Sequence, residues 1–217
     1  MIVLILCMAV FFLTGLILAE KKESTLGKLI TKLPLSILFV LAAMICQRPD
    51  PAYYRLILSG LLMSLLGDVL LVFYRRDLFL AGLAAFLMGH IFFALALFNL
   101  GRTPSPGWGF LCSVITIAGL GVFVWLRPHL GTMKGPVIAY LLVISCMLAG
   151  AGKVLFEPAV PKLGRGIIFA GALLFYFSDV FVARDRLVEK AFVNRLLGLP
   201  IYYAAQFLLA FSVGLVG

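Results

Sequence analysis

The sequence predicts an all-α membrane protein, a polytopic bundle of about eight transmembrane helices. Hydrophobic residues make up 64% of the 217 residues and charged residues only 12%, whereas soluble domains carry roughly 25% charged residues. A hydrocarbon core of about 30 Å needs about 20 apolar residues per helix, and short charged or Pro/Gly-marked connections divide this chain into eight such runs. We predict membrane helices over 2–18, 33–46, 54–73, 78–100, 108–126, 136–152, 164–183 and 197–216.

The first two runs need separate comment. The first begins at Met1, lacks a basic segment in front of it and is followed by Glu20-Lys21-Lys22-Glu23, so we expect a membrane helix and not a cleaved signal peptide. The second is the shortest. Pro34 suits its first turn, where a missing N–H would be unpaired anyway. Lys32 then lies at the membrane boundary, either as a snorkelling anchor or as a cation for a lipid phosphate.

The basic residues indicate an orientation. The net charge is +9, and of the 18 lysines and arginines twelve fall in the odd-numbered connections and six in the even-numbered ones. The positive-inside rule therefore predicts cytoplasmic odd connections and both termini outside. It also explains the charge without a nucleic-acid partner. Short connections and the lack of an organelle signal favour the bacterial inner membrane. Four cysteines without paired spacing suggest neither disulfides nor a zinc site.

Two aspartates stand in the middle of apolar runs, Asp68 near Ser64 and Asp179 beside Ser178. A charge at membrane depth costs at least ~2.5 to 3.5 kcal/mol on insertion scales, so such residues usually face a protein interior or a wet cavity. Gly60, Ser64 and Asp68 are spaced i, i+4, i+8, which lets another backbone approach and turns Asp68 toward it. A purely structural alternative is that both aspartates only join helices by hydrogen bonds.

The surroundings of the two aspartates are similar. Gly171 precedes Asp179 by eight residues, as Gly60 precedes Asp68, and after each aspartate come a basic connection and a helix with polar groups. We predict a single transmembrane domain over 1–217, with a weak internal repeat of helix pairs around 54–100 and 164–216. The polar groups of both pairs then meet in a shared cavity nearer the odd connections.

The helices after the aspartates and the sixth helix supply further candidates. His90 is the only histidine within an apolar run, and imidazole is the usual proton carrier near neutral pH. Tyr203 and Gln206 share a helix face at i, i+3. Tyr140 is an interior hydrogen-bond donor or aromatic bulk, and the sequence does not separate the two.

Two carboxylates in a partly dry site do not both ionise cheaply, which leaves a neutral acid beside an ionised base. Such a pair suits chemistry that passes through an oxocarbenium-like state. It equally suits a proton-coupled transporter or a lipid-handling membrane protein, in which carboxylates load and release protons. The residues alone leave both functions open.

A resemblance to a known family favours the first. The motifs Ser64-x-x-Gly67-Asp68, Gly82-x-x-x-Phe86-x-x-Gly89-His90, Ser178-Asp179 and Tyr203-x-x-Gln206, in this order on eight apolar helices, resemble the YhhN-like lysoplasmalogenase family of membrane hydrolases. The likeness covers nearly the whole chain. Lys32 and Pro34 also look like the family's pattern, although Leu33 separates them. The resemblance implies an ether hydrolase that cleaves the vinyl ether of a lysoplasmalogen, or of a related single-chain ether lysophospholipid. The products are a fatty aldehyde and glycerophosphoethanolamine or glycerophosphocholine, with no metal or organic cofactor.

The resemblance also suggests roles for residues. Asp68 and Asp179 act as acid and base in an order that stays open, and His90, Tyr203 and Gln206 orient water or hold the protonation states. Ser64 and Ser178 donate to the aspartates. The predicted site comprises catalytic Asp68, Asp179 and His90, with Ser64, Ser178, Tyr203, Gln206, Tyr140 and Lys32 at the substrate.

Overall fold

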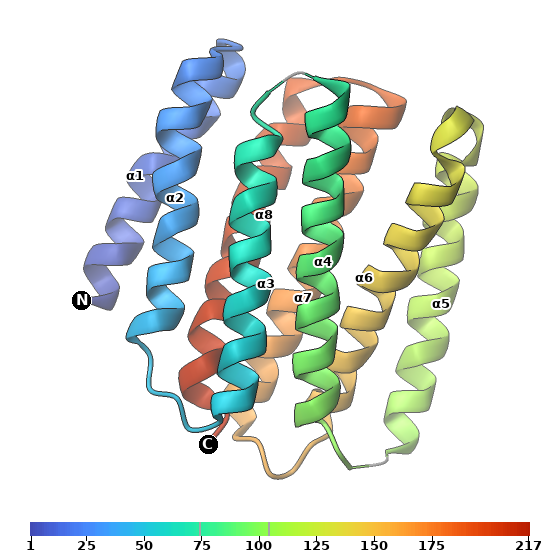
Figure 1. The fold of residues 1–217 in the computed structure, drawn as a ribbon. Coiled ribbons are helices and arrows are strands. Elements are labelled where there is room, and N and C mark those ends of the chain that lie inside the picture. Colours follow the sequence, from blue (N-terminus) through green and yellow to red (C-terminus); the bar gives the residue numbers. More distant parts are fainter. Residues whose placement is uncertain (74, 104) are drawn as a thin grey trace.

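The computed structural model describes residues 1–73, 75–103 and 105–217. Over these residues the chain is helical, without β-strands, and holds eight helices long and apolar enough to cross a membrane (Figure 1). The predicted all-α membrane bundle is confirmed. The helices are α1 (Ile2–Lys21), α2 (Thr25–Ile45), α3 (Pro51–Leu70), α4 (Arg76–Leu100), α5 (Pro106–Leu126), α6 (Lys134–Leu155), α7 (Lys162–Ala183) and α8 (Phe192–Ser212).

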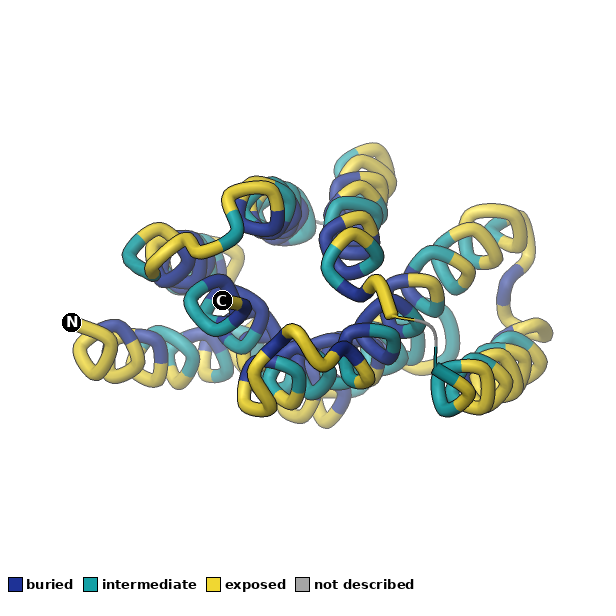
Figure 2. Tube along the Cα trace, turned by 90° about the horizontal axis from the view of Figure 1, so that it is seen from below, coloured by how far each residue is buried: buried dark blue, intermediate teal, exposed yellow. Residues whose placement is uncertain are grey.

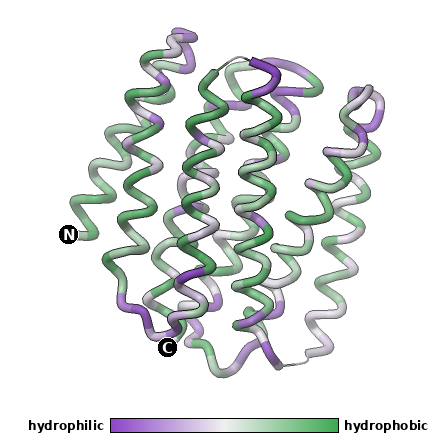
Figure 3. The backbone as a smooth tube through the Cα atoms, viewed as in Figure 1, coloured by the Kyte–Doolittle hydropathy of each residue, from purple (hydrophilic) through white to green (hydrophobic). Residues whose placement is uncertain are grey.

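The helices run up and down, so their connections gather at two ends. The α1–α2, α3–α4, α5–α6 and α7–α8 connections lie together at the upper end in Figure 1, which we call the odd end. The other three connections and the C-terminus lie at the opposite, even end. Figure 3 shows hydrophilic residues concentrated toward these ends and hydrophobic ones between them, as the membrane-spanning assignment requires.

The bundle has two rows of helices. Helices α2, α3 and α4 lie on one side and α1, α8 and α7 on the other (Figures 1 and 2). Helix α6 packs against α4 and α7, and α5 packs on the outside of α6. Figure 2 shows that the buried residues face the space between the rows, whereas exposed residues point outward. The tightest pairs are the antiparallel α3–α4 and α7–α8 hairpins.

Close packing of α3 on α4 depends on the small residues predicted to permit it. A Cβ atom on Gly67 would lie 2.6 Å from ring carbons of Phe86, and one on Gly60 would overlap the ring of Phe93. In return, a Cβ on Gly89 of α4 would lie 3.1 Å from the carbonyl oxygen of Gly60. Gly60 of the predicted stripe thus admits an aromatic ring and the α4 backbone, and Gly67, which was not part of that stripe, admits a second ring. Asp68 itself faces α2 and α8.

Helix α2 begins earlier than the sequence pattern predicted. It starts at Thr25 instead of 33, and the Ser24 side chain caps it by accepting a hydrogen bond from the Gly27 N–H at 3.1 Å. Pro34 therefore lies inside the helix and not in its first turn. The reason is that Lys28 and Lys32, which resemble charges of a connection, both have acidic partners within the bundle.

Helix α8 also begins earlier, at Phe192 instead of 197, with Pro200 inside it. A five-residue π-helical turn, Arg184–Val188, joins it to α7. In this turn Asp185 is buried, and its carboxylate accepts a hydrogen bond from the Ala191 N–H at 3.2 Å. This bond fixes the α7–α8 connection against the start of α8. The side chains of Asn194 and Arg195, in the first turn of α8, lie inside the bundle.

The even end is held by Glu157, which is only 5% exposed. Its carboxylate accepts hydrogen bonds from the backbone N–H groups of Arg102 (2.7 Å) and Thr103 (2.8 Å) and from the Thr103 hydroxyl (2.9 Å). The N–H bonds from Thr103 and Arg102 lower the pKa of Glu157 to about 2. One carboxylate thus joins the α4–α5 connection to the α6–α7 connection.

Candidate active site

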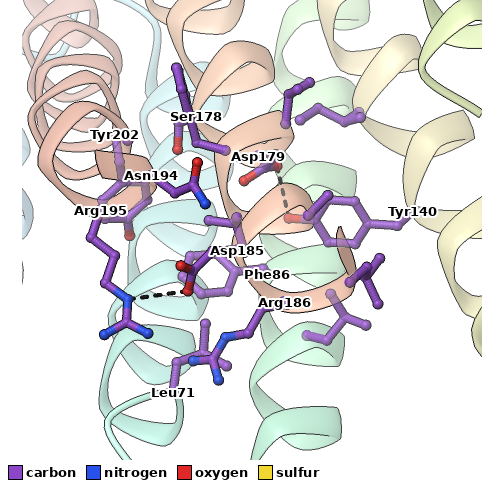
Figure 4. Close-up of a pocket in the computed structure, with 18 of the residues that line it drawn as sticks. Leu71, Phe86, Tyr140, Ser178, Asp179, Asp185, Arg186, Asn194, Arg195 and Tyr202 are labelled. Atoms are coloured by element: carbon purple, nitrogen blue, oxygen red, sulfur yellow. Dashed lines mark hydrogen bonds and ion pairs between the residues drawn. The ribbon is translucent and has the colours of Figure 1, made fainter. Parts of the chain in front are cut away.

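A cavity of about 180 Å³ lies between the two rows of helices, and both Asp68 and Asp179 line it. All eight helices or their ends contribute to its lining. The lining extends from the two aspartates to the odd end, where Glu20, Asp185 and Arg195 surround it. Figure 4 shows part of this wall, with Asp179 and Tyr140 on one side and Tyr202 and Asn194 on the other. The cavity therefore connects membrane-depth carboxyl groups to one surface of the bundle.

Asp68 on α3 has a complete set of partners. The Lys32 ammonium lies 2.9 Å from Oδ1, while the Ser36 hydroxyl (2.6 Å) and the Tyr202 phenol (2.8 Å) donate to Oδ2. The Gln206 amide in turn donates to the Tyr202 oxygen at 3.0 Å. Asp68 itself is 1% exposed. An opposite charge and two charge-assisted hydrogen bonds are what a buried carboxylate needs in order to stay ionised.

The interpretation of Lys32 as a boundary residue was incomplete. Its side chain is 13% exposed and pairs with Asp68 inside the bundle. Because α2 begins at Thr25, Lys32 lies two turns into the helix and projects between the rows. Tyr203 and Gln206 reach Asp68 indirectly, since the Tyr203 oxygen lies 3.3 Å from Ser36 Oγ and Gln206 acts through Tyr202.

Asp179 on α7 has a different environment. Its Oδ2 accepts a hydrogen bond from the Tyr140 phenol at 2.9 Å, and His90 Nε2 lies 3.4 Å away. The Nδ1 of His90 is 2.7 Å from the Phe86 carbonyl oxygen. Since a carbonyl only accepts, Nδ1 carries the hydrogen and Nε2 faces the carboxyl group. Among the described residues no lysine or arginine forms an ion pair with Asp179.

An aromatic ring separates the two clusters. The centroid of Phe175 lies 4.5 Å from that of His90 and 5.5 Å from that of Tyr202. The sequence argument derived an acid and a base from mutual repulsion of two carboxylates. In the structure the two carboxyl groups differ in their partners instead, because Lys32 pairs with Asp68 whereas His90 lies beside Asp179.

The cavity mouth is formed by paired charges. Glu20 lies 3.0 Å from Lys28 and 2.8 Å from Arg195, and Arg195 lies 3.1 Å from Asp185. Figure 4 shows the Asp185–Arg195 pair beside Asn194. Sequence reasoning did not find this network, since each member stands at the end of an apolar run and resembles an ordinary topological charge.

Contrary to the prediction, neither Ser64 nor Ser178 forms a hydrogen bond with an aspartate. The Ser64 hydroxyl donates to the Gly60 carbonyl of its own helix at 3.0 Å. Ser178 Oγ lines the cavity but has no hydrogen-bond partner within the described part of the chain. Ser36 supplies instead the hydroxyl that donates to Asp68. Nor do three His, Cys, Asp or Glu side chains converge as a metal site would require, among the described residues.

The site can now be compared with known proteins. The model of the YhhN family matches residues 26–213. This chain belongs to the YhhN family. Among its relatives is a protein named lysoplasmalogenase from Mycobacterium bovis, 31% identical over 174 residues, which are 78% of this chain and 63% of the relative. Lysoplasmalogenase TMEM86B of Rattus norvegicus is 35% identical over 165 residues, covering 76% and 64%. The protein of that name from Sus scrofa is 32% identical over 210 residues, covering 94% and 82%.

This YhhN-family chain thus spans less than two thirds of the length of the first two relatives. No solved structure matches it. Besides the charges at the mouth, its candidate site contains three residues that the sequence interpretation did not include, Ser36, Tyr202 and Asn194. A weak signal existed for Tyr202, which neighbours Tyr203 in an apolar run. Ser36 and Asn194 had none, because a lone serine or asparagine in a helix usually bonds to its own backbone.

Proposed function

We propose that this protein is a lysoplasmalogenase, which hydrolyses the vinyl ether bond of a lysoplasmalogen to a fatty aldehyde and a glycerophospho-ethanolamine or -choline. The observation that carries the proposal is one cavity lined by two unlike carboxyl groups. Asp68 has a cationic partner, and Asp179 has a histidine and a phenol. The names of the mycobacterial and mammalian relatives support the same reaction.

The chemistry needs one proton donor and one anionic group. A vinyl ether hydrolyses when its β-carbon accepts a proton, which produces an oxocarbenium ion. Water adds to this cation and loses a proton, and the resulting hemiacetal collapses to the aldehyde and the glycerol alcohol. General acid catalysis contributes roughly 10²- to 10⁴-fold, and a fixed negative charge close to the cation stabilises it further. One water is consumed, and the catalyst regains its proton.

We assign Asp179 as the proton donor. Asp179 and His90 Nε2 lie 3.4 Å apart without a lysine or arginine partner in the described structure, so burial favours a state in which the pair holds one proton. The Tyr140 hydroxyl donates to the oxygen that faces His90 and orients the group. Delivery of this proton to carbon leaves Asp179 as the anion that later accepts a proton from water.

Asp68 then acts as the carboxylate. With the Lys32 ammonium at 2.9 Å and donors from Ser36 and Tyr202, it is held ionised through the cycle. It stabilises the oxocarbenium ion electrostatically, while the proton of the attacking water returns to Asp179. Lys32 acts through Asp68 and is therefore a positioning residue.

The lining of the cavity suits a single-chain lipid. Its walls include the apolar side chains Val122, Val137 and Leu141 of α5 and α6. An alkenyl chain that lies against them stays in an apolar environment. The paired charges at the odd end suit a headgroup that carries both a phosphate and an amine. The lipid thus enters with its headgroup toward the odd end.

For localisation we propose the bacterial inner membrane, with the odd end in the cytoplasm and both termini outside. The support is the excess of lysine and arginine in the odd connections, since such residues concentrate on the cytoplasmic side. In a cysteine-free background, a single cysteine at Lys190 should resist a membrane-impermeant maleimide in intact spheroplasts and react after lysis. Labelling in intact spheroplasts would reverse the orientation.

The activity is tested on the purified protein in detergent, with lysoplasmalogen as substrate and the fatty aldehyde trapped for mass spectrometry. Asp68→Asn and Asp179→Asn should each lower kcat/KM by at least about 100-fold. Asp77→Asn is the matched control, because Asp77 is exposed and pairs with Arg75 at the surface. Wild-type rates in either cavity variant would remove that residue from the mechanism. Absence of aldehyde from folded wild type, with substrate-driven proton flux in liposomes, would favour transport instead.

A further inference from the structure

Three side chains that line the cavity have a buried polar atom without a partner among the described residues, Tyr176 Oη, Ser178 Oγ and Asn194 Oδ1. Ser178 and Asn194 are the most deeply buried of the three, at 1% and 2% exposed. Buried polar groups in native proteins are nearly always hydrogen-bonded, so each exception asks for an explanation. Neither residue takes part in the acid–base chemistry proposed above.

The orientation of the Asn194 amide is fixed by the chain. Its Nδ2 donates to the carbonyl oxygen of Glu189 at 2.9 Å, and the reverse orientation would place two oxygens against each other. Oδ1 therefore lies on the side of the amide away from Glu189, in a residue that lines the cavity. The backbone N–H of Asn194 donates to Ala191 at 3.0 Å, which anchors this first turn of α8. Asn194 thus presents a rigid acceptor.

Ser178 supplies the complementary donor from α7. A Cβ atom on Gly198 of α8 would lie 3.0 Å from Phe181 and 4.0 Å from the Ser178 carbonyl oxygen, so the two helices approach closely here. Figure 4 shows Ser178 and Asn194 on the same wall of the cavity, with Asp179 next to Ser178. A donor and an acceptor therefore stand together beside the proposed proton donor.

The pair fits a neutral hydroxyl group. A hydroxyl donates its hydrogen to Asn194 Oδ1 while its oxygen accepts from Ser178 Oγ, and both orphaned groups are satisfied. Neither side chain is charged, so a phosphate or an ammonium gains less here than at the paired charges of the mouth. A lysophospholipid carries one free hydroxyl on glycerol, at the sn-2 carbon, between the ether at sn-1 and the phosphate at sn-3.

The order of groups along α8 matches the order along such a lipid. Tyr202, which contacts Asp68, stands eight residues after Asn194, about 12 Å deeper along the helix, and Arg195 stands at the mouth. From depth to surface the wall thus presents the acid–base groups, the Ser178–Asn194 pair and the charged rim. The lipid presents vinyl ether, hydroxyl and phosphate in the same sequence.

We propose that Ser178 and Asn194 bind the free sn-2 hydroxyl of the substrate and thereby select lipids with one chain over lipids acylated at that carbon. The proposal rests on the proposed function and deepens it. A site built to bind a hydroxyl discriminates strongly against an analogue without it, because its own buried groups are then left unpaired. An sn-2 ester removes the hydroxyl hydrogen that Asn194 Oδ1 would accept.

The test compares lysoplasmalogen with its 2-deoxy analogue, in which CH₂ replaces the sn-2 carbinol. The kcat/KM of each is divided by that compound's rate of hydrolysis in acid without enzyme, which removes its intrinsic reactivity. Wild type should prefer the hydroxyl substrate by about 100-fold. Ser178→Ala and Asn194→Leu should reduce this ratio to about tenfold or less, whereas Asn99→Leu on the exposed even end of α4 should leave it unchanged.

The ratio is measured within one sample, so it does not depend on the fraction of folded protein. If wild type hydrolyses both compounds equally well, the hydroxyl pair is wrong and the proposed function stands. A ratio that survives both cavity substitutions would likewise overturn the assignment to these residues. If wild type releases aldehyde from neither compound, the proposed function fails and this inference fails with it.

Discussion

Replacing Lys32 by methionine tests the central electrostatic feature of the site. Methionine keeps most of the length and apolar volume of lysine but removes the ammonium 2.9 Å from Asp68. The side chain of Asp68 is only 2% exposed, so water does not replace the lost partner. Ser36 and Tyr202 still donate to the carboxylate, but two neutral donors do not compensate a full charge in an apolar bundle.

The expected loss in the free energy of unfolding differs between a substitution of Lys32 and one of Asp68. Removing one partner of a buried ion pair typically destabilises a protein by about 3 to 5 kcal/mol, and Lys32→Met falls in this range. Asp68→Asn leaves the ammonium instead, and Lys32 is 13% exposed on a flexible stem that reaches toward water. We therefore expect only about 1 to 2 kcal/mol for Asp68→Asn. The double variant removes both charges, so its cost lies below the sum by at least about 2 kcal/mol.

Thermal unfolding in detergent measures these differences. For a chain of this size about 1 kcal/mol corresponds to a Tm change of about 2 to 4 °C, so Lys32→Met should lower Tm by about 6 °C or more. Adding Asp68→Asn to that variant should restore part of the loss without restoring hydrolysis. Effects that add within about 0.5 kcal/mol would show that the two residues are not coupled. The account of Asp68 as an ionised carboxylate would then be wrong.

Three further predictions concern stability and rate. Glu157→Gln should lower the free energy of unfolding by about 2 kcal/mol. The pKa of Glu157 in the folded protein, about 2, lies below its usual 4.5, so this contribution is present above pH 4.5 and disappears as the pH falls toward 2. The unfolding curves of variant and wild type should therefore converge near pH 2. Tyr140→Phe removes the donor to Asp179 and should slow aldehyde release about tenfold without changing Tm by more than a few degrees. A Cβ on Gly164 would overlap the Leu215 carbonyl oxygen, whereas one on Gly166 meets nothing within 4 Å. Gly164→Ala should therefore lower Tm, and Gly166→Ala should leave it unchanged. Equal Tm values for the two variants would contradict this packing.

Hydropathy was sufficient to predict the architecture because the bilayer restricts the choices. A helix that spans lipid must satisfy its backbone internally and be about 20 residues long, and each of the eight predicted runs overlaps an observed helix. The spacing of Gly60, Ser64 and Asp68 also identified the approach of α4 to Gly60 and Ser64, whereas Asp68 turns toward α2 and α8. Local periodicity carries this information, since residues four apart lie on one side of a helix.

The partners of the aspartates could not be predicted in this way. Lys32 is separated from Asp68 by 36 positions and Tyr202 by 134, so only the arrangement of helices joins them. The helix starts added a second obstacle. A lysine near an apolar run looks like a connection residue, and this reading placed Lys32 outside the helix that projects it into the cavity. An error in the predicted start of a helix thus also produces an error in the predicted role of a polar residue near that start.

The distribution of charge argues most directly for how the site works. Of the four carboxyl groups in the described cavity lining, Glu20, Asp68 and Asp185 each lie within 3.1 Å of a lysine or arginine nitrogen. The fourth, Asp179, has His90 at 3.4 Å instead. A lysine or arginine holds its partner as an anion, but imidazole gives and takes a proton readily near neutral pH. Because the other carboxyl groups of the described lining are paired with lysine or arginine, the proposed mechanism takes its proton from the Asp179–His90 pair. In that mechanism the vinyl ether reaches Asp179, and Asp68 contributes through its charge.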